Sequence, residues 1–435
     1  MKTLEQAIKL ALVGSKHIYA CGESYVEPVR LPAGVSLFGG FDCENGWKYV
    51  GLARRAKITP GPGSVALVFL EGEGKSLAGD LEVRSADAEG AGESSIAALV
   101  QDAATGSLVR TDLHAGNGAD GADGENGGHA GGAKDGLPGV NGTDACTSNP
   151  GLGGSAIELN CGDGTMSVSG PGGDGGEMVA TNGGDGLPMP EPNPASFGLG
   201  GKGEAVAPKC TGGTNGDQGE PGADGVPATA AEGRITKEGA VIGRDGGDGE
   251  PGRPGQGGGG GGASFGNALV CGAAPHGGAG GGSGGTGGCG GRGGRGGQAG
   301  GSSLDLVVRG PNFTFADIRI TVGKGGRGGN GGQSQPGGQG GLPGTGGQAS
   351  GGVGGVQSGC GGGVGGNGGN GGYGAGGHGG DAINVAMVGL PNVPLAGKSE
   401  SYAGEGGPGG LAGNPASLGQ RGGDGVAAAA GFYDP

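Results

Sequence analysis

The apolar positions of this chain change their period along its length. Within residues 1–21 they recur at helical spacing on one face, which predicts an amphipathic helix. This face carries Leu4, Ile8, Ala11 and Leu12. Short β-rich runs follow, separated by Gly, Pro and Asn, and no helix is long enough to form a βαβ unit. We predict strands at 17–25, 35–41, 65–70 and 77–84.

An internal repeat organises the rest of the chain. Copies begin at Ser94, Ser302 and Asp381, and each reads as a strand, a turn, a second extended segment and a glycine-rich tract. A fainter copy begins at Ser155 and predicts a β-coil near 155–170. The chain then divides into five parts. A cap with β-coils at 1–115 is followed by a first glycine-rich excursion at 116–301 and a returning β-coil at 302–323. A second excursion at 324–380 precedes a last β-coil with a glycine tract and tail at 381–435.

Composition separates the first division from the rest. Of 129 glycines, only 15 fall in residues 1–115, and aromatic residues make up 3% of the chain. An ordinary hydrophobic core therefore cannot run along the whole length. Collagen is disfavoured by 25 prolines and short Gly-X-Y runs. Disorder is the other alternative, because glycine loses much backbone entropy on folding.

The glycine tracts have a period of three, which predicts ordered packing. Tracts 324–347 and 351–380 carry glycine at two of every three positions. In a left-handed, threefold extended helix those positions form faces without Cβ atoms, so neighbouring helices approach closely. Such a helix has no internal hydrogen bonds, and its backbone groups must pair with neighbours. We therefore expect bundles of polyglycine II-type helices.

The eight cysteines also favour an ordered structure. No CxxC pair occurs, so disulfides and an oxidising compartment explain them better than zinc or redox chemistry. Each disulfide would stabilise the fold by about 3 to 5 kcal/mol in the chain-entropy model. The predicted disulfide cysteines are Cys21, Cys43, Cys146, Cys161, Cys210, Cys271, Cys289 and Cys360.

The order IYACGESYVEPVRLPAGVSLFGGFDC at 18–43 resembles the opening coils of pectate-lyase-like right-handed parallel β-helices, particularly secreted bacterial members. The resemblance implies an all-β fold, a helix capping the first coil, and coils of about 20 to 25 residues. Cys21 and Cys43 would then stack on adjacent coils. The other pairings proposed are Cys146 with Cys161, Cys210 with Cys271, and Cys289 with Cys360, among 105 connectivities that eight cysteines allow.

The glycine tracts are similar to those of springtail antifreeze proteins and of some phage tail-tip adhesins. That likeness covers only the Gly-x-x pattern and implies stacked layers of extended helices. An ice-binding face would repeat small residues such as Ala or Thr, whereas the third positions here vary among Val, Asn, Asp, Arg, Gln, Tyr and His. Ice binding is therefore the third functional hypothesis.

The net charge and the absence of targeting signals limit the classes of partner that are expected. The net charge is −15 with a pI near 4.7, and the only basic element is the short run from Arg292 to Arg295, so nucleic acid is not expected. No apolar run reaches the roughly 18 to 20 residues of a membrane span. Glu5 and Lys9 interrupt the apolar part of residues 1–21, so an exported protein would have lost its signal before this numbering begins.

Candidate chemistry is sparse. Charged residues cluster at Asp80, Glu82, Arg84, Asp87 and Glu89, where alternation would place 80, 82 and 84 on one strand face. A solvated face is the favoured interpretation, and a polysaccharide-processing groove is the alternative. No catalytic residue and no cofactor is predicted.

Two further clusters are candidate binding sites. Phe41, Trp47 and Tyr49 would serve either as a sugar platform or as a plug of the first coils, and a plug is expected. Asp-rich turns at 118–128 and 243–249 are candidate calcium sites. They lack the apolar residue that a calcium-binding β-roll places after its Asp, so calcium binding is not predicted.

These observations predict a secreted, non-enzymatic structural or adhesive protein, including a self-assembling fibre subunit. The alternative is a polysaccharide-active β-helix enzyme. The expected partners are further copies of the chain, to which the apolar tail at 426–433 would dock, and cell-surface polysaccharide.

Overall fold

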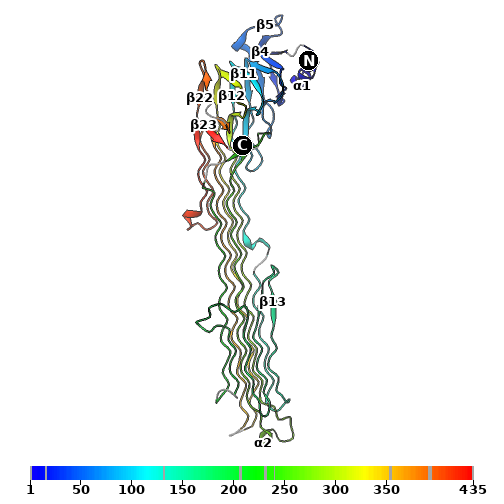
Figure 1. Ribbon diagram of the computed structural model, residues 1–435, viewed down its shortest axis with the longest axis vertical. Helices are drawn as coiled ribbons and strands as arrows, with labels where there is room; N and C mark the ends of the chain where they lie inside the picture. Colours follow the sequence, from blue (N-terminus) through cyan, green and yellow to red (C-terminus); the bar gives the residue numbers. More distant parts are fainter. Residues whose placement is uncertain are drawn as a thin grey trace.

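The computed structural model describes residues 2–14, 17–130, 133–204, 208–229, 233–239, 241–351, 355–389 and 394–433. A β-rich head lies at one end, and a rod of glycine-rich segments extends from it to a tip that carries α2 (Ala268–Cys271) (Figure 1). Both ends of the described chain lie in the head. At about 3.1 Å per residue, a rod segment such as 276–301 spans about 80 Å.

The head contains three parallel sheets that the chain visits in turn, so an all-β class is correct. Sheet 1 lists, in spatial order, β1 (His17–Cys21), β4 (Ser36–Asp42), β8 (Lys75–Gly79), β11 (Thr105–Val109), β18 (Phe313–Ala316) and β21 (Leu395–Ala396), with β5 (Lys48–Tyr49) antiparallel to β4. Sheet 2 lists β2 (Ser24–Tyr25), β6 (Ala56–Ile58), β9 (Leu81–Arg84), β12 (Asp112–His114), β19 (Arg319–Thr321) and β22 (Glu400–Tyr402).

Sheet 3 completes each circuit of the chain. In spatial order it contains β3 (Val29–Leu31), β7 (Leu67–Phe69), β10 (Ser95–Val100), β17 (Ser303–Val308), β20 (Ala382–Val388) and β23 (Ala427–Tyr433). The tail expected to dock on a neighbour is thus β23, paired in parallel with β20 of the same chain. The three repeat copies correspond to successive visits to sheets 3, 1 and 2.

Helix α1 (Leu4–Val13) covers the first strands, as predicted. Thr3 caps it by accepting a hydrogen bond from the Gln6 amide, and Leu4, Ile8 and Ala11 are buried in the core that the three sheets enclose. Leu12 is 52% exposed, so the buried stripe is narrower than the sequence suggested.

A second apolar cluster lies on the outer face of sheet 3. There the hairpin of β15 (Arg234–Ile235) and β16 (Val241–Ile242) packs on the head, with Ile235 against side chains such as Leu99 and Leu304. This hairpin belongs to the first glycine-rich excursion. The excursion therefore returns to the head midway and is anchored there by apolar packing.

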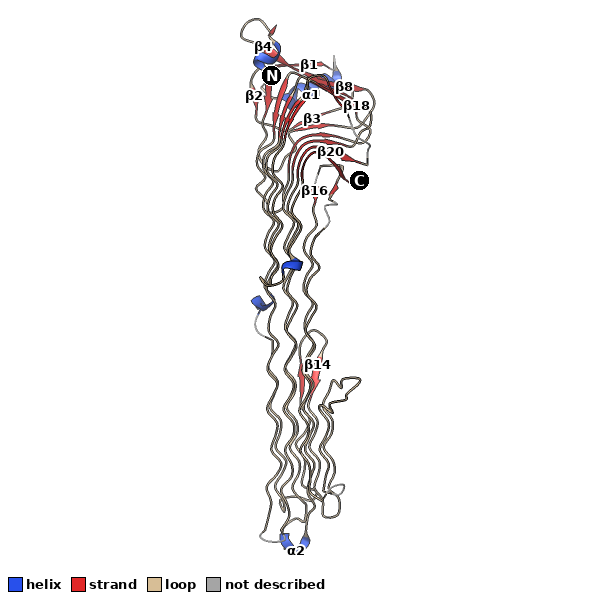
Figure 2. Ribbon diagram, turned by 90° about the vertical axis from the view of Figure 1, so that its left-hand side faces the viewer, coloured by secondary structure: helices blue, strands red, loops and turns tan. Residues whose placement is uncertain are grey.

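All three glycine-rich excursions leave the head at the same corner. They start after β12, β19 and β22 of sheet 2 and end at β17, β20 and β23 of sheet 3. The rod continues the order of the strands: Gly118 donates to Lys324 O at 2.8 Å, and Gly325 donates to Glu405 O at 2.9 Å. Figure 2 shows these extended segments running together from the sheets towards the tip.

Lateral backbone hydrogen bonds hold the rod together. They recur at every third residue, as where Gly121, Gly124 and Gly127 donate to carbonyls of a neighbouring segment at 2.7 to 2.8 Å. Within the described residues, these segments contain only short elements of regular secondary structure. Besides α2 and the β15–β16 hairpin, these are η2 (Gly127–Ala130), η3 (Leu418–Gln420) and the hairpin of β13 (Glu158–Asn160) and β14 (Met166–Val168).

Close approach of neighbouring backbones explains the glycines. Residues 257–262 are six consecutive, fully buried glycines. A Cβ at Gly260 would lie 1.8 Å from Pro171 O, and one at Gly259 would lie 2.0 Å from Leu199 O. Segment 118–127, at an edge, has one glycine per triplet and exposes the other positions except half-buried Ala119. The number of glycines per triplet thus reports how many faces of a segment are covered.

Polar side chains at the remaining positions satisfy backbone donors. Asp120 Oδ1 accepts from the Arg327 amide, and Asp123 Oδ1 accepts from the Asn330 amide, both at 2.7 Å. Near the tip, where short hairpins cover the central segment, buried Ser283 accepts from the Val140 amide at 2.8 Å. Asp and Asn therefore extend the lateral network at edges that lack a backbone acceptor.

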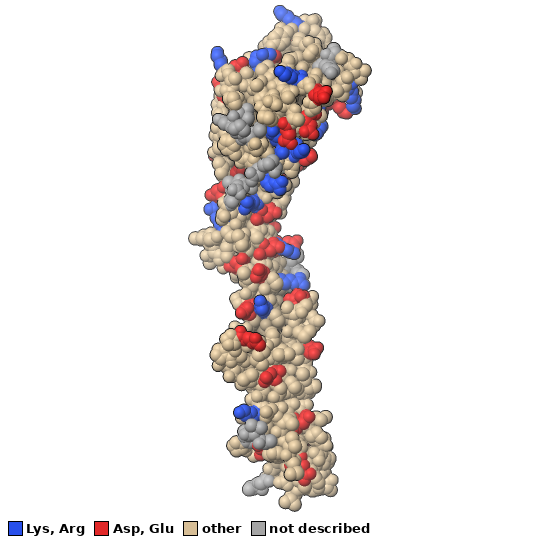
Figure 3. All heavy atoms as spheres, in the orientation of Figure 1, with Lys and Arg blue, Asp and Glu red and all other residues tan. Residues whose placement is uncertain are grey.

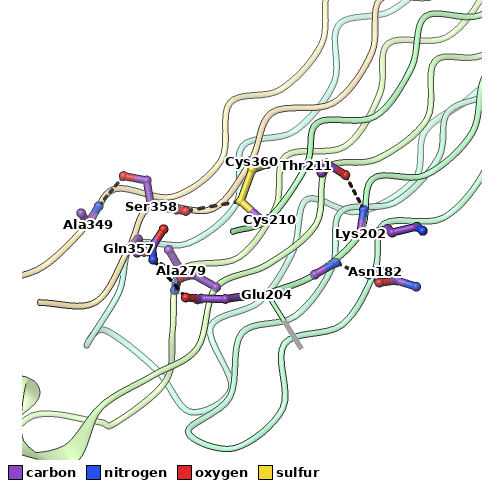
Figure 4. The surroundings of a disulfide bond; sticks show 12 residues. Asn182, Lys202, Glu204, Cys210, Thr211, Ala279, Ala349, Gln357, Ser358 and Cys360 are labelled. Atoms are coloured by element: carbon purple, nitrogen blue, oxygen red, sulfur yellow. Dashed lines mark hydrogen bonds between the residues drawn. A yellow bond between two sulfur atoms is a disulfide. The ribbon is translucent and has the colours of Figure 1, made fainter. Parts of the chain in front are cut away.

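All eight cysteines form disulfides, and one predicted pairing is confirmed. The pairs are Cys21–Cys43, Cys146–Cys271, Cys161–Cys289 and Cys210–Cys360. The three other predicted pairings are wrong, because the rod folds back repeatedly and brings together segments 125 to 150 residues apart. Figure 4 shows the last pair joining two extended segments. The disulfides indicate an oxidising environment.

Three predicted strand assignments also need correction. The β-coil expected near 155–170 is the antiparallel β13–β14 hairpin on the rod, since glycine-rich segments on both sides keep it away from the parallel sheets. The strand expected at 17–25 is two strands, β1 in sheet 1 and β2 in sheet 2. The strand expected at 77–84 is likewise two strands, β8 and β9. Asp80 separates them with a φ of 57°, which turns the chain from sheet 1 to sheet 2.

Candidate functional site

Aromatic rings gather on the outer face of sheet 1 at the first strands. Tyr19 of β1 lies opposite Phe38 of β4, and their ring centroids are 6.0 Å apart. Phe41 of β4 contacts both Tyr19 at 5.2 Å and Tyr49 of β5 at 5.5 Å. His17 stands 6.5 Å from Phe38. We call His17, Tyr19, Phe38, Phe41 and Tyr49 the aromatic patch.

The aromatic patch is open to solvent. Tyr19 is 53% exposed and Tyr49 is 51% exposed, and Trp47, two residues before Tyr49, is 54% exposed. The expectation that Phe41, Trp47 and Tyr49 plug the first coils is therefore wrong. The interior is filled by aliphatic side chains, by Phe69, Phe313 and Phe315, and by one face of α1, so the rings of the patch point outward.

The register of β1, β4 and β5 is fixed beside the patch. The Cys21–Cys43 disulfide joins the end of β1 to the residue after β4, and Cys21 lies opposite Phe41 in the sheet. Glycines at 40 and 51 leave room for the Tyr49 ring, since a Cβ at Gly40 would lie 3.1 Å from it. The rings are therefore held in place by the fold itself.

Asp80 joins the aromatic patch to a neighbouring groove. Its side chain is 1% exposed and accepts from the Tyr49 hydroxyl at 3.0 Å and from Arg110 through two hydrogen bonds of 2.8 Å. The bonds to Asp80 raise the pKa of the Arg110 guanidinium. Burial and the same carboxylate raise the pKa of Tyr49. Both groups therefore keep their protons at neutral pH.

The charged groove lies between sheets 1 and 2 and has a volume of about 360 Å³. Arg55 donates to Asp112 at 2.7 Å, and Arg319 pairs with Glu400 at 3.2 Å. The charged groups that line it are Arg55, Arg110, Asp112, Asp317, Arg319, Lys398 and Glu400. It therefore presents donors and acceptors close together, with four cations and three carboxylates along its walls.

The acidic cluster singled out in the sequence is divided by the structure. Glu82 faces outward on β9, between Lys57 at 3.2 Å and Arg84 at 2.6 Å. Burial opposes ionisation of Glu82, but hydrogen bonds from these two cations outweigh it and lower its pKa. Asp80 lies instead at the corner before β9 and is buried, so 80, 82 and 84 do not share one exposed face.

The other members of that cluster have different surroundings. Asp87 is exposed and accepts from the Asn117 amide at 2.7 Å, and Glu89 is exposed. His114, half-buried on β12, was not singled out in the sequence. Burial and the nearby Arg84 lower its pKa, so it is neutral at physiological pH.

The charged turns of the rod are part of its hydrogen-bond network. The Asp-rich turns include Asp248, which accepts from the Gly296 amide at 2.8 Å and pairs with Arg295 at 2.5 Å. Among the described residues no group of three or more His, Cys, Asp or Glu is arranged to hold a metal ion. On the face shown in Figure 3, acidic and basic side chains intermix over the head and along the rod.

A second groove, of about 810 Å³, lies on the side of the rod. Its walls include Met166, Met189 and the prolines at 188, 190 and 192. Arg253 pairs with Glu220 at 3.4 Å, and both side chains are exposed. In the groove wall, buried Gln256 accepts from the Asp217 amide at 3.1 Å and donates to Gly186 O at 3.0 Å, so its polar groups are engaged with the backbone of the rod.

Sequence reasoning missed most of the aromatic patch. Positions 17 and 19 alternate with buried positions in one predicted strand, and 38 lies in the next, so period-two alternation would have placed these rings outward. Nothing in the sequence indicated that Arg55 and Arg110 line the same groove. They come together there only because successive circuits of the chain lie next to each other.

Among the described residues, no helix is both long and apolar enough to cross a bilayer. No protein-family model, curated protein or solved structure matches this chain.

Proposed function

We propose that this is a secreted, non-enzymatic adhesive protein whose head binds polysaccharide and whose rod acts as a rigid spacer. The observation that carries the proposal is the exposed aromatic patch at the end of the particle opposite the α2 tip (Figure 1). Contiguous exposed apolar surface on a soluble protein marks a binding site.

The proposal includes a finer description of the fold. We infer that the head is a short right-handed parallel β-helix capped by α1, of the kind that the pectate-lyase-like resemblance implies. We infer that the rod is a bundle of polyglycine II-type helices. Three parallel sheets visited in turn, and hydrogen bonds repeating every third residue, support these assignments. Four disulfides support secretion.

The chemistry of the head favours a carbohydrate ligand. A pyranose ring has C–H groups on its faces and hydroxyl groups around its edge. Tyr19 and Phe38 offer flat apolar rings, while the Tyr49–Asp80–Arg110 network leads from the patch to the paired donors and acceptors of the charged groove. A sugar chain lying across both would match apolar and polar surfaces in turn.

The charged groups favour binding over turnover. A carboxyl group that acts as a general acid must stay protonated near neutral pH. A carboxylate that acts as a general base must not already be paired with a cation. Asp80 and Asp112 are each held by an arginine, and the cations beside Glu82 lower its pKa. The polysaccharide-active enzyme therefore remains the second proposal.

The proposal is tested by calorimetry of the intact protein with a panel of soluble neutral and acidic polysaccharides. We expect at least one to bind, and Tyr19→Ala with Tyr49→Ala to weaken that binding at least tenfold. The matched control is Tyr373→Ala on the rod, which should bind normally. No binding across the panel, or equal loss in the control, would overturn the proposal. New reducing or unsaturated ends after long incubation would favour the enzyme.

A further inference from the structure

Strand β23 leaves one edge of sheet 3 open. It pairs with β20 on one side, and among the described residues no strand pairs with its other side. Strands β21 and β22 likewise end sheets 1 and 2. The last circuit of the head therefore presents unpaired backbone donors and acceptors, which are the groups that recruit a further strand.

Within the described strand, the open edge lacks the charge and the proline that protect natural edge strands. Residues 425–433 contain no charged side chain and no proline. Phe432 is 66% exposed, and Ala429 and Ala430 are exposed beside it. Edge strands usually carry charge, proline or a covering element to prevent pairing with another chain.

The opposite end of the head is closed. Helix α1 buries Leu4, Ile8 and Ala11 against the first strands, and Glu27 accepts from the Leu4 amide at 2.6 Å. A second copy therefore cannot stack its first circuit on β23 without displacing α1. Head-to-tail addition, which a fibre requires, is blocked at this end.

We propose that β23 pairs with β23 of a second copy, forming a closed twofold dimer. The same edge on both copies is the complementary surface that remains, and a twofold axis makes the two strands antiparallel. In the register centred on Ala430, this small and exposed residue faces the same residue of the partner subunit, so the two strands can approach closely.

A closed dimer places two heads in one particle. Both aromatic patches lie on the first strands of sheet 1, at the far end of the sheet from its last strand β21, and remain free. Two sites that engage one polymer raise the apparent affinity without new contacts. The dimer itself does not depend on polysaccharide binding and is tested without it.

Sedimentation and light scattering of the intact protein over a range of concentrations test the assembly. We expect a particle of twice 40.4 kDa that stays at that mass as concentration rises. Phe432→Lys should shift it to the monomer. The matched control is Val26→Lys, because Val26 is 78% exposed near the first strands, and it should remain dimeric. A wild-type monomer, continuous growth in mass, or dissociation of the control would overturn the proposal.

A cross-linking variant covers the case in which Phe432→Lys fails to fold. The native cysteines are all in disulfides, so one added thiol reports on the interface. Oxidised Ala430→Cys should form a covalent dimer, because the twofold axis places residue 430 beside itself. Val26→Cys should not. Failure of Ala430→Cys to cross-link while Val26→Cys does would contradict the interface.

Discussion

The buried carboxylate of Asp80 and the guanidinium of Arg110 share two hydrogen bonds of 2.8 Å across the corner between sheets 1 and 2. The same carboxylate accepts from Tyr49 of the aromatic patch. One residue therefore positions both a ring of the patch and a cation of the charged groove.

Replacing Asp80 with Asn tests that link. Asn tolerates the positive φ at this corner, so the substitution removes charge with little change in backbone strain. We expect a loss of about 1–3 kcal/mol in unfolding free energy, because Arg110 loses its charged acceptor. Chemical denaturation measures it. Asp87→Asn is the control, since exposed Asp87 should be replaceable at little cost; an equal loss there would contradict the role assigned to Asp80.

Glycine at position 260 tests the packing of the rod. A Cβ there would lie 1.8 Å from Pro171 O, so Gly260→Ala forces two backbones apart. We expect destabilisation of at least about 1–3 kcal/mol, as for overpacked cores. Gly419→Ala is the matched control, because no atom lies within 4 Å of its added Cβ. Equal melting temperatures for the two variants would show that the rod is not close-packed.

The pH dependence of stability tests buried Asp305. Its carboxylate accepts from the Ala115 amide inside the head, and burial raises its pKa well above the ordinary value. The folded state therefore favours the protonated acid, and stability falls as pH rises from the unfolded pKa towards the raised folded one. Asp305→Asn removes this penalty. We expect the variant to be more stable than wild type at pH 7, with the difference vanishing below about pH 4; a variant less stable at pH 7 would contradict this account.

The disulfides should contribute according to the loops they close. Cys161–Cys289 spans 128 residues and Cys21–Cys43 spans 22. The chain-entropy model assigns about 5 kcal/mol to the first and about 3 kcal/mol to the second. Paired Cys→Ser variants, compared by calorimetric melting, should follow this order. A larger loss from the shorter loop would mean that local packing at the aromatic patch outweighs chain entropy.

The sequence predicts the local elements of the head better than the path of the rod. Leu4, Ile8 and Ala11 recur at helical spacing and are buried as expected, because a single helix face is a local property. The Cys21–Cys43 pair follows from one circuit of the chain. The Cys161–Cys289 pair depends instead on how many times the rod folds back, which a repeated Gly-x-x pattern does not specify.

The binding surface shows the same division. Outward positions of Tyr19 and Phe38 follow from strand alternation. The contact between Asp80 and Arg110 joins residues in successive circuits and requires the turn at Asp80, which propensity alone does not predict. Local pattern therefore locates the rings, whereas stacking order locates the charges beside them.

Small-angle X-ray scattering tests most directly the central claim that an ordered rod carries the head. A rod of about 80 Å joined to a head gives a radius of gyration of about 30–40 Å for one chain. A compact globule of this length would give about 22 Å, and a disordered chain about 77 Å. We predict an elongated monomer in the Phe432→Lys variant, in the range expected for the rod. A value near either extreme would contradict the account.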